Sequence, residues 1–269
     1  MPSPERATTP QYETGLYVPG HYGTGLSRVP EISAAFWLTK ILTTGMGETT
    51  SDFFVTRFEP VVAVLVAAVV LAGVLVLQFR ARRYLPWLYW LTVAAISVFG
   101  TMAADVAHVA IGIPYPVSTL AFAAVLAVVL TVWHRTEGTL SVHSITTGRR
   151  EALYWMTVLV TFALGTAAGD LTATVFHLGY LGSGLLFAAL ILVPVIAFRF
   201  SLLGATAAFW FAYTLTRPLG ASFADWFGVS AERGGLDLGT GPVSLVLAGA
   251  IACCVLYLAH IERARTRAT

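Results

Sequence analysis

The sequence predicts an all-α polytopic membrane protein with eight transmembrane helices, arranged as four parallel two-helix repeats with pseudo-symmetry about the membrane normal. Three observations support this fold class. The 269 residues are 57% hydrophobic and only 11% charged, whereas soluble domains contain roughly 25% charged residues. Long apolar stretches recur along the chain, and one short motif occurs four times. The composition excludes a soluble enzyme, a nucleic-acid-binding protein and a disordered regulator.

Eight stretches are long enough to cross the hydrocarbon core, which takes about 20 helical residues. Four are uniformly apolar: Pro60–Phe79, Pro116–Trp133, Leu181–Phe198 and Pro242–His260. Four more are apolar but contain ionisable residues: Ala34–Phe54, Trp87–Ala110, Leu153–Leu178 and Gly204–Phe227. The two kinds alternate, so each polar stretch is followed by an apolar one, and the eight pair into four two-helix units.

The chain divides at its polar connections. We expect residues 1–30 to form a flexible cytoplasmic tail, because they are polar, rich in Pro, Gly, Thr and Tyr, and lack the apolar core of a signal peptide. The repeats then occupy residues 31–86, 87–150, 151–203 and 204–269. The second repeat ends in a cytoplasmic loop and the fourth in a short C-terminal tail.

Positive charge predicts the orientation. Most arginines fall after the second, fourth, sixth and eighth spans: Arg80, Arg82, Arg83, Arg135, Arg149, Arg150, Arg199, Arg263, Arg265 and Arg267. The other connections contain only Arg57 and Arg233. Because cytoplasmic loops are enriched in Lys and Arg, both termini are expected in the cytoplasm, with the lipid bilayer as the surroundings of the chain.

The repeated motif is W-x9-G-x4-D. Its tryptophans are Trp37, Trp90, Trp155 and Trp210, its glycines are Gly47, Gly100, Gly165 and Gly220, and its aspartates are Asp52, Asp105, Asp170 and Asp225. With two spans per repeat, the four motif helices enter the membrane in the same direction, as in transporters built from parallel repeats. The motifs therefore lie at matching depths, with the tryptophans near the inner interface and the aspartates in the outer third.

Helical periodicity places the motif aspartates on one face with other polar residues. At 100° per residue, positions 7, 11 and 15 after the tryptophan lie close together. Position 7 is Thr44, Ser97, Phe162 or Arg217, and position 11 is Glu48, Thr101, Thr166 or Ala221. His108 and His177 extend this face outwards. The glycines lie on a different side, where a small residue lets a neighbouring helix approach closely.

The phased acids predict a shared ionic site. Carboxylates about 4 Å apart repel each other by roughly 4 kcal/mol at an effective dielectric constant of 20. A group of them therefore binds protons, binds a metal ion, or exchanges one for the other. We therefore expect a cation transporter coupled to protons, with Asp52, Asp105, Asp170, Asp225 and Glu48 as ion ligands. Oxygen ligands favour a divalent metal such as magnesium or manganese, and no covalent cofactor is expected.

Several other residues are candidates for supporting roles. Thr44, Thr101 and Thr166 add oxygen atoms to the site. His108 and His177 either contribute nitrogen ligands or cap the outer ends of their spans. Arg217 is expected to be an internal counter-charge to the carboxylates. Lys40, the only lysine in the chain, is expected to extend its amine towards the inner interface.

Three segments resemble a known family: Lys40-Ile-Leu-Thr-Thr-Gly45, Ala163-Leu-Gly-Thr-Ala-Ala-Gly-Asp170 and Leu215-Thr-Arg-Pro-Leu-Gly-Ala221. They resemble uncharacterised bacterial membrane-anchored proteins built from four tandem two-span repeats of unknown function, each with a tryptophan. The resemblance extends from Glu31 to His260 and implies an eight-span protein of the bacterial inner membrane. It implies no particular activity.

Alternative functions fit the same residues. One is a proton-coupled carrier of a small organic solute, with the carboxylates serving only as proton relays. Another is a structural or sensory membrane protein, whose acids simply cap helix ends near the outer headgroups. An intramembrane enzyme with paired aspartates is a further alternative. We expect no enzyme, because the sequence contains no nucleotide-binding loop and no G-x-S-x-G motif.

Overall fold

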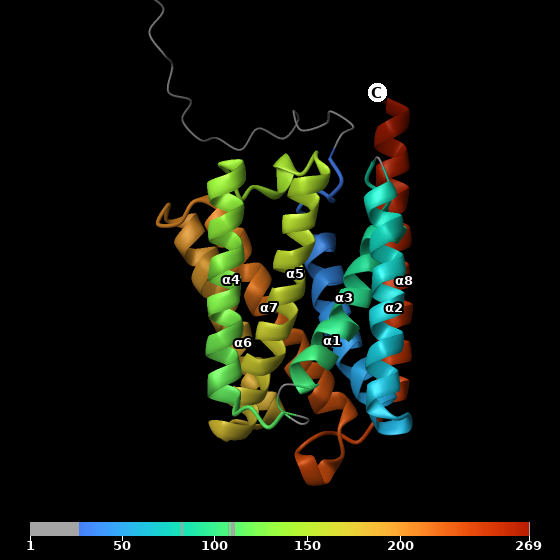
Figure 1. The fold of residues 1–269 in the computed structure, drawn as a ribbon, viewed down its shortest axis with the longest axis vertical. Coiled ribbons are helices and arrows are strands. Elements are labelled where there is room, and N and C mark those ends of the chain that lie inside the picture. The colour runs from blue at the N-terminus through green and yellow to red at the C-terminus, as the bar shows by residue number, and fades with distance from the viewer. Residues whose placement is uncertain (1–26, 82, 107, 109–110, 269) are drawn as a thin grey trace, which may run out of the picture.

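The computed structural model describes residues 27–81, 83–106, 108 and 111–268, and the secondary structure of these residues is entirely helical (Figure 1). The long helices are α1 (Ala34–Arg57), α2 (Pro60–Arg80), α3 (Pro86–Asp105), α4 (Tyr115–Glu137), α5 (Gly148–Asp170), α6 (Gly179–Arg199), α7 (Ala205–Gly228) and α8 (Thr240–Ala268). Short helices are η2 (Val142–Ser144), η3 (Leu171–Val175) and η4 (Ala231–Arg233). Most of the predicted N-terminal tail, residues 1–26, lies outside the described residues.

The helices form two concentric layers. Helices α1, α3, α5 and α7 make an inner ring in which each contacts the next and α7 contacts α1. The outer helices α2, α4, α6 and α8 pack against α3, α5, α7 and α1, respectively. Each repeat therefore contributes one inner and one outer helix, and its outer helix covers the inner helix of the following repeat. The whole arrangement is a cyclic, fourfold pseudo-symmetric bundle.

The outer surface is apolar, as expected for a membrane protein. Six helices are long and apolar enough to cross a membrane among the residues described: α2, α3, α4, α5 with η3, α6, and α8 up to Ala264. Outer helices expose large apolar side chains such as Leu120 and Leu245, at 72% and 76%. Exposed apolar surface of this extent is a mark of contact with lipid or a partner. Helices α1 and α7, whose inner faces carry the most charged side chains, do not meet this criterion of length, hydropathy and charge.

One end of the inner ring is closed by aromatic side chains. The residue before each motif tryptophan packs against the tryptophan of the following repeat. The ring centroids of these pairs are 5.6 Å apart for Phe36–Trp90, 5.3 Å for Tyr89–Trp155, 6.0 Å for Tyr154–Trp210 and 5.5 Å for Phe209–Trp37. We call this the aromatic end and the opposite end, where the motif aspartates lie, the acidic end. The tryptophans thus pack inside the bundle and join all four repeats.

The motif glycines lie where the inner helices touch. Each faces the position-7 residue of the following repeat: Gly47 faces Ser97, Gly100 faces Phe162, Gly165 faces Arg217 and Gly220 faces Thr44. A Cβ atom at Gly220 would lie 1.8 Å from the Thr44 hydroxyl and 2.7 Å from the Ile41 carbonyl oxygen. The ring can close at this spacing only because these positions have no side chain.

The end of the predicted tail is held against the aromatic end. Arg28 donates a backbone hydrogen bond to the Ile145 carbonyl, and its guanidinium pairs with Glu151 at 2.5 Å. Glu151 is buried and also accepts hydrogen bonds from the side chains of Gln78 and Trp155. The described end of the tail therefore contacts the bundle, because the buried Glu151 carboxylate needs the opposite charge that Arg28 supplies.

Candidate functional site

The inner helices place a column of side chains along the axis of the ring. On each inner helix these side chains are four residues apart, so they lie on one face of the helix, and this face rotates slightly from one layer to the next. After the aromatic layer, the next layer is Lys40, Val93, Val158 and Tyr213; then follow Thr44, Ser97, Phe162 and Arg217; and then Glu48, Thr101, Thr166 and Ala221. All twelve are buried. The last layer, at the acidic end, consists of the four motif aspartates.

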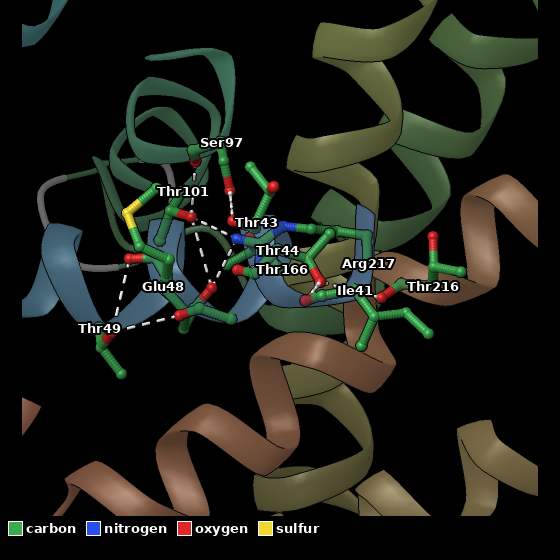
Figure 2. A network of polar contacts seen from close by, with 12 residues as sticks. Ile41, Thr43, Thr44, Glu48, Thr49, Ser97, Thr101, Thr166, Thr216 and Arg217 are labelled. Carbon is green, nitrogen blue, oxygen red and sulfur yellow. Dashed lines mark hydrogen bonds and ion pairs between the residues drawn. The ribbon is translucent and has the colours of Figure 1, made fainter. Parts of the chain in front are cut away.

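Arg217 is the centre of this column (Figure 2). Its side chain is fully buried, and its Nη2 donates to the Glu48 carboxylate at 2.5 Å, to the Thr166 hydroxyl at 2.8 Å and to the Thr101 hydroxyl. Its Nη1 donates to the Thr44 backbone carbonyl at 2.9 Å. One guanidinium from the fourth repeat therefore bonds to all three other repeats.

The packing of neighbouring residues explains how this arginine fits. Gly165 leaves room for its stem, since a Cβ there would lie 2.2 Å from the Arg217 Cγ. The guanidinium carbon lies 5.2 Å from the Phe162 ring centroid. Two charges removed from water are tolerated only when they pair closely and their remaining hydrogen-bonding groups are satisfied. The Arg217–Glu48 pair meets that condition except at Nε, which has no partner.

The four motif aspartates converge at the acidic end. Each interacts electrostatically with Glu48 and Arg217. Asp105 also interacts with Asp52 and Asp170, and so does Asp225. Asp225 is buried, and its Oδ1 has no hydrogen-bond partner, whereas the other three are partly exposed. The acids thus form one mutually repelling group that interacts with the positive charge of Arg217, and Arg233 also acts on Asp52 and Asp170.

The convergence does not amount to a preformed metal centre. Across the described residues, no three His, Cys, Asp or Glu side chains are grouped closely enough to hold a metal ion. The proposed ligands Asp52, Asp105, Asp170 and Asp225 therefore interact over a distance without sharing one coordination sphere.

The two histidines considered as supporting ligands lie away from the axis. His108 Nδ1 contacts the Ile113 carbonyl at 3.1 Å, and its ring lies 4.1 Å from that of Tyr115 at the start of α4. His177 is exposed and has a positive φ of 56°. The α-helical phase on which both predictions rested is lost just before them, because π-helical turns follow Asp105 and Asp170. An extra residue in a turn rotates all later side chains.

Lys40 does not extend to the interface, so that prediction was wrong. Its side chain is 1% exposed, and its Nζ has no hydrogen-bond partner. The Nζ lies 4.1 Å from the Phe162 ring centroid and 4.3 Å from that of Tyr213. Lys40 precedes Thr44 and Glu48 by one and two helical turns on the same face, and this phase directs it to the axis.

Two cavities lie at the ends of the bundle. One of about 410 Å³ at the acidic end is lined by Asp52, Arg57 and Arg233 together with the start of α8. The other, of about 610 Å³, lies between the end of α4 and the start of α7 at the aromatic end, next to Trp210. Arg57 and Arg233 were not predicted as site residues, because both lie outside the repeated motif.

A pair of buried tyrosines in the aromatic layer was not predicted from the sequence. The hydroxyl groups of Tyr89 and Tyr154 are 2.5 Å apart and hydrogen-bonded. Their signal in the sequence is the aromatic residue that precedes every motif tryptophan, which is tyrosine in the second and third repeats and phenylalanine in the others.

Comparison with known proteins gives a family but no activity. No curated protein and no solved structure matched the chain. A family model described as a repeat of unknown function, DUF347, matches four segments: residues 35–84, 88–139, 153–201 and 208–264. Each segment contains one inner and one outer helix of the bundle. The matches cover most of the chain, which therefore belongs to the DUF347 family of four-repeat proteins.

Proposed function

We propose that the chain is an eight-span integral membrane protein that transports a cation along the axis of its inner ring, coupled to protons. One observation carries this proposal: Lys40, Glu48 and Arg217 are buried inside an apolar shell, and the aspartate of every inner helix interacts electrostatically with Glu48 and Arg217. Ionisable residues within a membrane bundle are costly and mark ion or proton pathways. A purely structural role gives no reason for acids of matching phase in every repeat to meet.

The charged inner faces of α1 and α7 are compatible with spanning the membrane. Their charged side chains Lys40, Glu48 and Arg217 point to the axis and are buried, so lipid does not have to solvate them. Eight spans follow if both helices cross the bilayer with the other six. The arginine-rich connections and the C-terminus then lie at the aromatic end, which becomes the cytoplasmic side by the positive-inside rule.

The central ion pair supplies a mechanism for coupling. Glu48 is held by Arg217 at 2.5 Å, and a proton or a cation arriving at Glu48 competes with the guanidinium for the same carboxylate. Once displaced, Arg217 loses its counter-charge, and the motif aspartates, which interact with it electrostatically, are the remaining acids that can take over that role. A ligand that shifts one charge of a buried pair thus changes the contacts of all four repeats, because Arg217 bonds to each of the other three.

The cargo expected from the ligands is a divalent metal such as manganese or magnesium. Carboxylate and hydroxyl oxygens are the donors that these ions prefer. Because the acids do not already form a coordination sphere, cation binding requires them to draw together. Bound charge would relieve their mutual repulsion, which amounts to roughly 4 kcal/mol for each pair at about 4 Å and a dielectric constant of 20.

Reconstitution tests the proposal. Proteoliposomes loaded with a manganese-sensitive dye and a pH-sensitive dye report Mn²⁺ entry and proton movement together. We expect Mn²⁺ uptake with opposite proton flow, and loss of both in Asp105→Asn and Asp170→Asn. The matched control is Asp237→Asn, since Asp237 lies in the loop between η4 and α8. Full flux in the Asp105 and Asp170 variants would overturn the mechanism.

A small organic solute is the second candidate cargo, favoured by the acidic-end cavity. The cavity presents positive charge from Arg57 and Arg233 beside the negative charge of Asp52, and two arginines repel a metal ion but suit a solute with a carboxylate. The two cargoes are distinguished by stability, because a ligand that binds only the folded protein stabilises it. If a metal ion is the cargo, Mn²⁺ raises the Tm of the protein. If a small organic solute is the cargo, an amino acid such as glycine raises it.

A further inference from the structure

Two segments cover the aromatic end of the inner ring. Residues 27–33 lead into α1, and residues 138–147 connect α4 to α5. The two segments meet where the backbone N–H of Arg28 donates to the Ile145 carbonyl at 3.2 Å. Val29 from the first segment and Ile145 from the second are buried in the same hydrophobic cluster as the aromatic layer. The segments therefore form a second closing layer outside the aromatic rings.

The first of these segments, residues 27–33, crosses the end of the ring, and we call it the strap (Figure 1). One end of the strap is fixed to α1 by Ser33, whose side chain accepts a hydrogen bond from the Phe36 N–H. The other end contacts the start of α5. Because the ring order is α1, α3, α5 and α7, α5 faces α1 across the ring. The strap thus extends from one side of the ring to the opposite side.

A buried ion pair holds the far end of the strap. The Arg28 guanidinium donates to the Glu151 carboxylate at 2.5 Å, and Glu151 is 1% exposed. Gln78 and Trp155 donate to the other carboxylate oxygen, but neither carries a charge. Removing the partner of a buried charge is strongly destabilising. Glu151 therefore stays dry only while the strap is in place, and water has to enter this end of the bundle when the strap leaves.

This ion pair is confined to one repeat. Glu151 lies four residues before its motif tryptophan, and the corresponding residues of the other repeats are Ser33, Pro86 and Thr206. The packing that the four repeats share thus requires no acid at this position. Most of the strap also precedes the first segment that matches the family model, which begins at residue 35. The strap and its acidic partner are therefore an addition to the repeated bundle.

We propose that the strap is a detachable cover of the inner ring, held closed by the Arg28–Glu151 pair. In the described chain the strap is joined to a helix at one end only, whereas residues 138–147 are joined at both ends and held by a hydrogen bond from Trp210 to the Leu140 carbonyl. Elements with few buried contacts open locally while the rest of a protein stays folded. Control of transport by the strap rests on the proposed function, but detachment of the strap does not.

The first experiment measures how often the strap detaches. In full-length protein with Cys253→Ala and Cys254→Ala, in lipid nanodiscs, Val29→Cys places a thiol on the strap where the side chain is only 8% exposed. A charged thiol reagent labels this position only when the strap leaves the bundle. Arg28→Gln should raise the labelling rate at least tenfold. That change corresponds to about 1.4 kcal/mol and lies within the contribution of a charged hydrogen bond.

Two controls accompany this measurement. Glu137→Gln removes two ion pairs with arginines of α5 at the same end of the bundle and should leave the labelling rate of Val29→Cys unchanged. Ser183→Cys, at a position that is 0% exposed near the start of α6, should stay unlabelled in the Arg28→Gln background. An unchanged rate in both Arg28→Gln and Glu151→Gln would overturn the proposal. Equal rises at positions 29 and 183 would also overturn it, because the strap would then not detach separately from the bundle.

The second experiment tests whether detachment opens the ring. In the same background, Val29→Cys/Ile145→Cys places two thiols at the contact between the strap and residues 138–147, and oxidation should join them. In proteoliposomes the joined protein should carry at least tenfold less Mn²⁺ flux, and dithiothreitol should restore the flux. The single variant Val29→Cys, oxidised in the same way, should keep its flux.

The outcomes separate the strap from the proposed function. Full flux through the joined protein would reject the strap as a control of transport and retain transport itself. If the protein moves neither Mn²⁺ nor protons before oxidation, the proposed function fails, and the labelling rates still decide whether the strap detaches.

Discussion

The variant Glu48→Gln isolates the energetic role of the central ion pair. Arg217 is fully buried, so removing its counter-charge leaves an unpaired guanidinium in the bundle. Removing one partner of a buried pair costs about 3–5 kcal/mol. The glutamine oxygen still accepts one hydrogen bond from Nη2, and a bond to a charged group is worth about 1.5–3 kcal/mol. We therefore expect the free energy of unfolding to fall by about 2 kcal/mol.

The assay is chemical denaturation in mixed micelles, followed by the fluorescence of the buried tryptophans. Glu232→Gln, in the exposed η4 turn, is the matched control and should unfold like the wild type. In the double variant Glu48→Gln/Arg217→Met, neither position of the ion pair retains an unpaired charge. Its loss of stability should therefore be smaller than the sum of the two single losses, by about 1–3 kcal/mol.

Two results would refute this reasoning. A Glu48→Gln variant within about 0.5 kcal/mol of the wild type would mean that Arg217 is solvated, since only surface substitutions have effects that small. Strictly additive single and double losses would mean that the two side chains do not interact.

Other predictions concern the packing of the ring. Gly220→Ala should destabilise the protein by about 1–3 kcal/mol, the usual cost of overpacking a close contact, because the new methyl group meets Thr44 and the Ile41 carbonyl oxygen. The control is Gly73→Ala, where a methyl group meets nothing within 4 Å. This variant should be neutral or stabilising in the same denaturation assay. Trp90→Ala should cost about 3–5 kcal/mol, because Trp90 is 1% exposed in the aromatic layer. Trp87→Ala, on the same helix but 56% exposed, should cost far less. Similar losses at both tryptophans would contradict the internal aromatic layer.

The repeat pattern predicted the architecture because helical phase is encoded locally. In a regular helix, the aspartate fifteen residues after each tryptophan lies on the same face as the residue at position 11. Three of these position-11 residues, Glu48, Thr101 and Thr166, bond to Arg217 in the structure. The positions of the motif glycines likewise follow from phase, since position 10 lies away from the polar face. Four repeats of the same pattern then left a ring as the natural arrangement.

Other features of the site depend on contacts between helices, which the periodicity of a single helix does not predict. Arg217 was expected to pair with the carboxylates as a group, and its partner is Glu48 from another repeat, which the phase of α7 alone does not identify. Lys40 was expected at the interface because long cationic side chains usually reach water, but here the aromatic layer closes the path. The helical phase assumed for His108 and His177 does not hold, because π-helical turns follow the aspartates.

The claim most directly open to measurement is that acids from opposite sides of the ring meet at one axis. In a background with Cys253→Ala and Cys254→Ala, the variant Asp52→Cys/Asp170→Cys places thiols on α1 and α5, which face each other across the ring. A short bifunctional thiol reagent applied to membranes should join the two within one chain, detected after proteolytic cleavage of the α2–α3 connection. Single labelling of both cysteines without any joining would contradict a common axis.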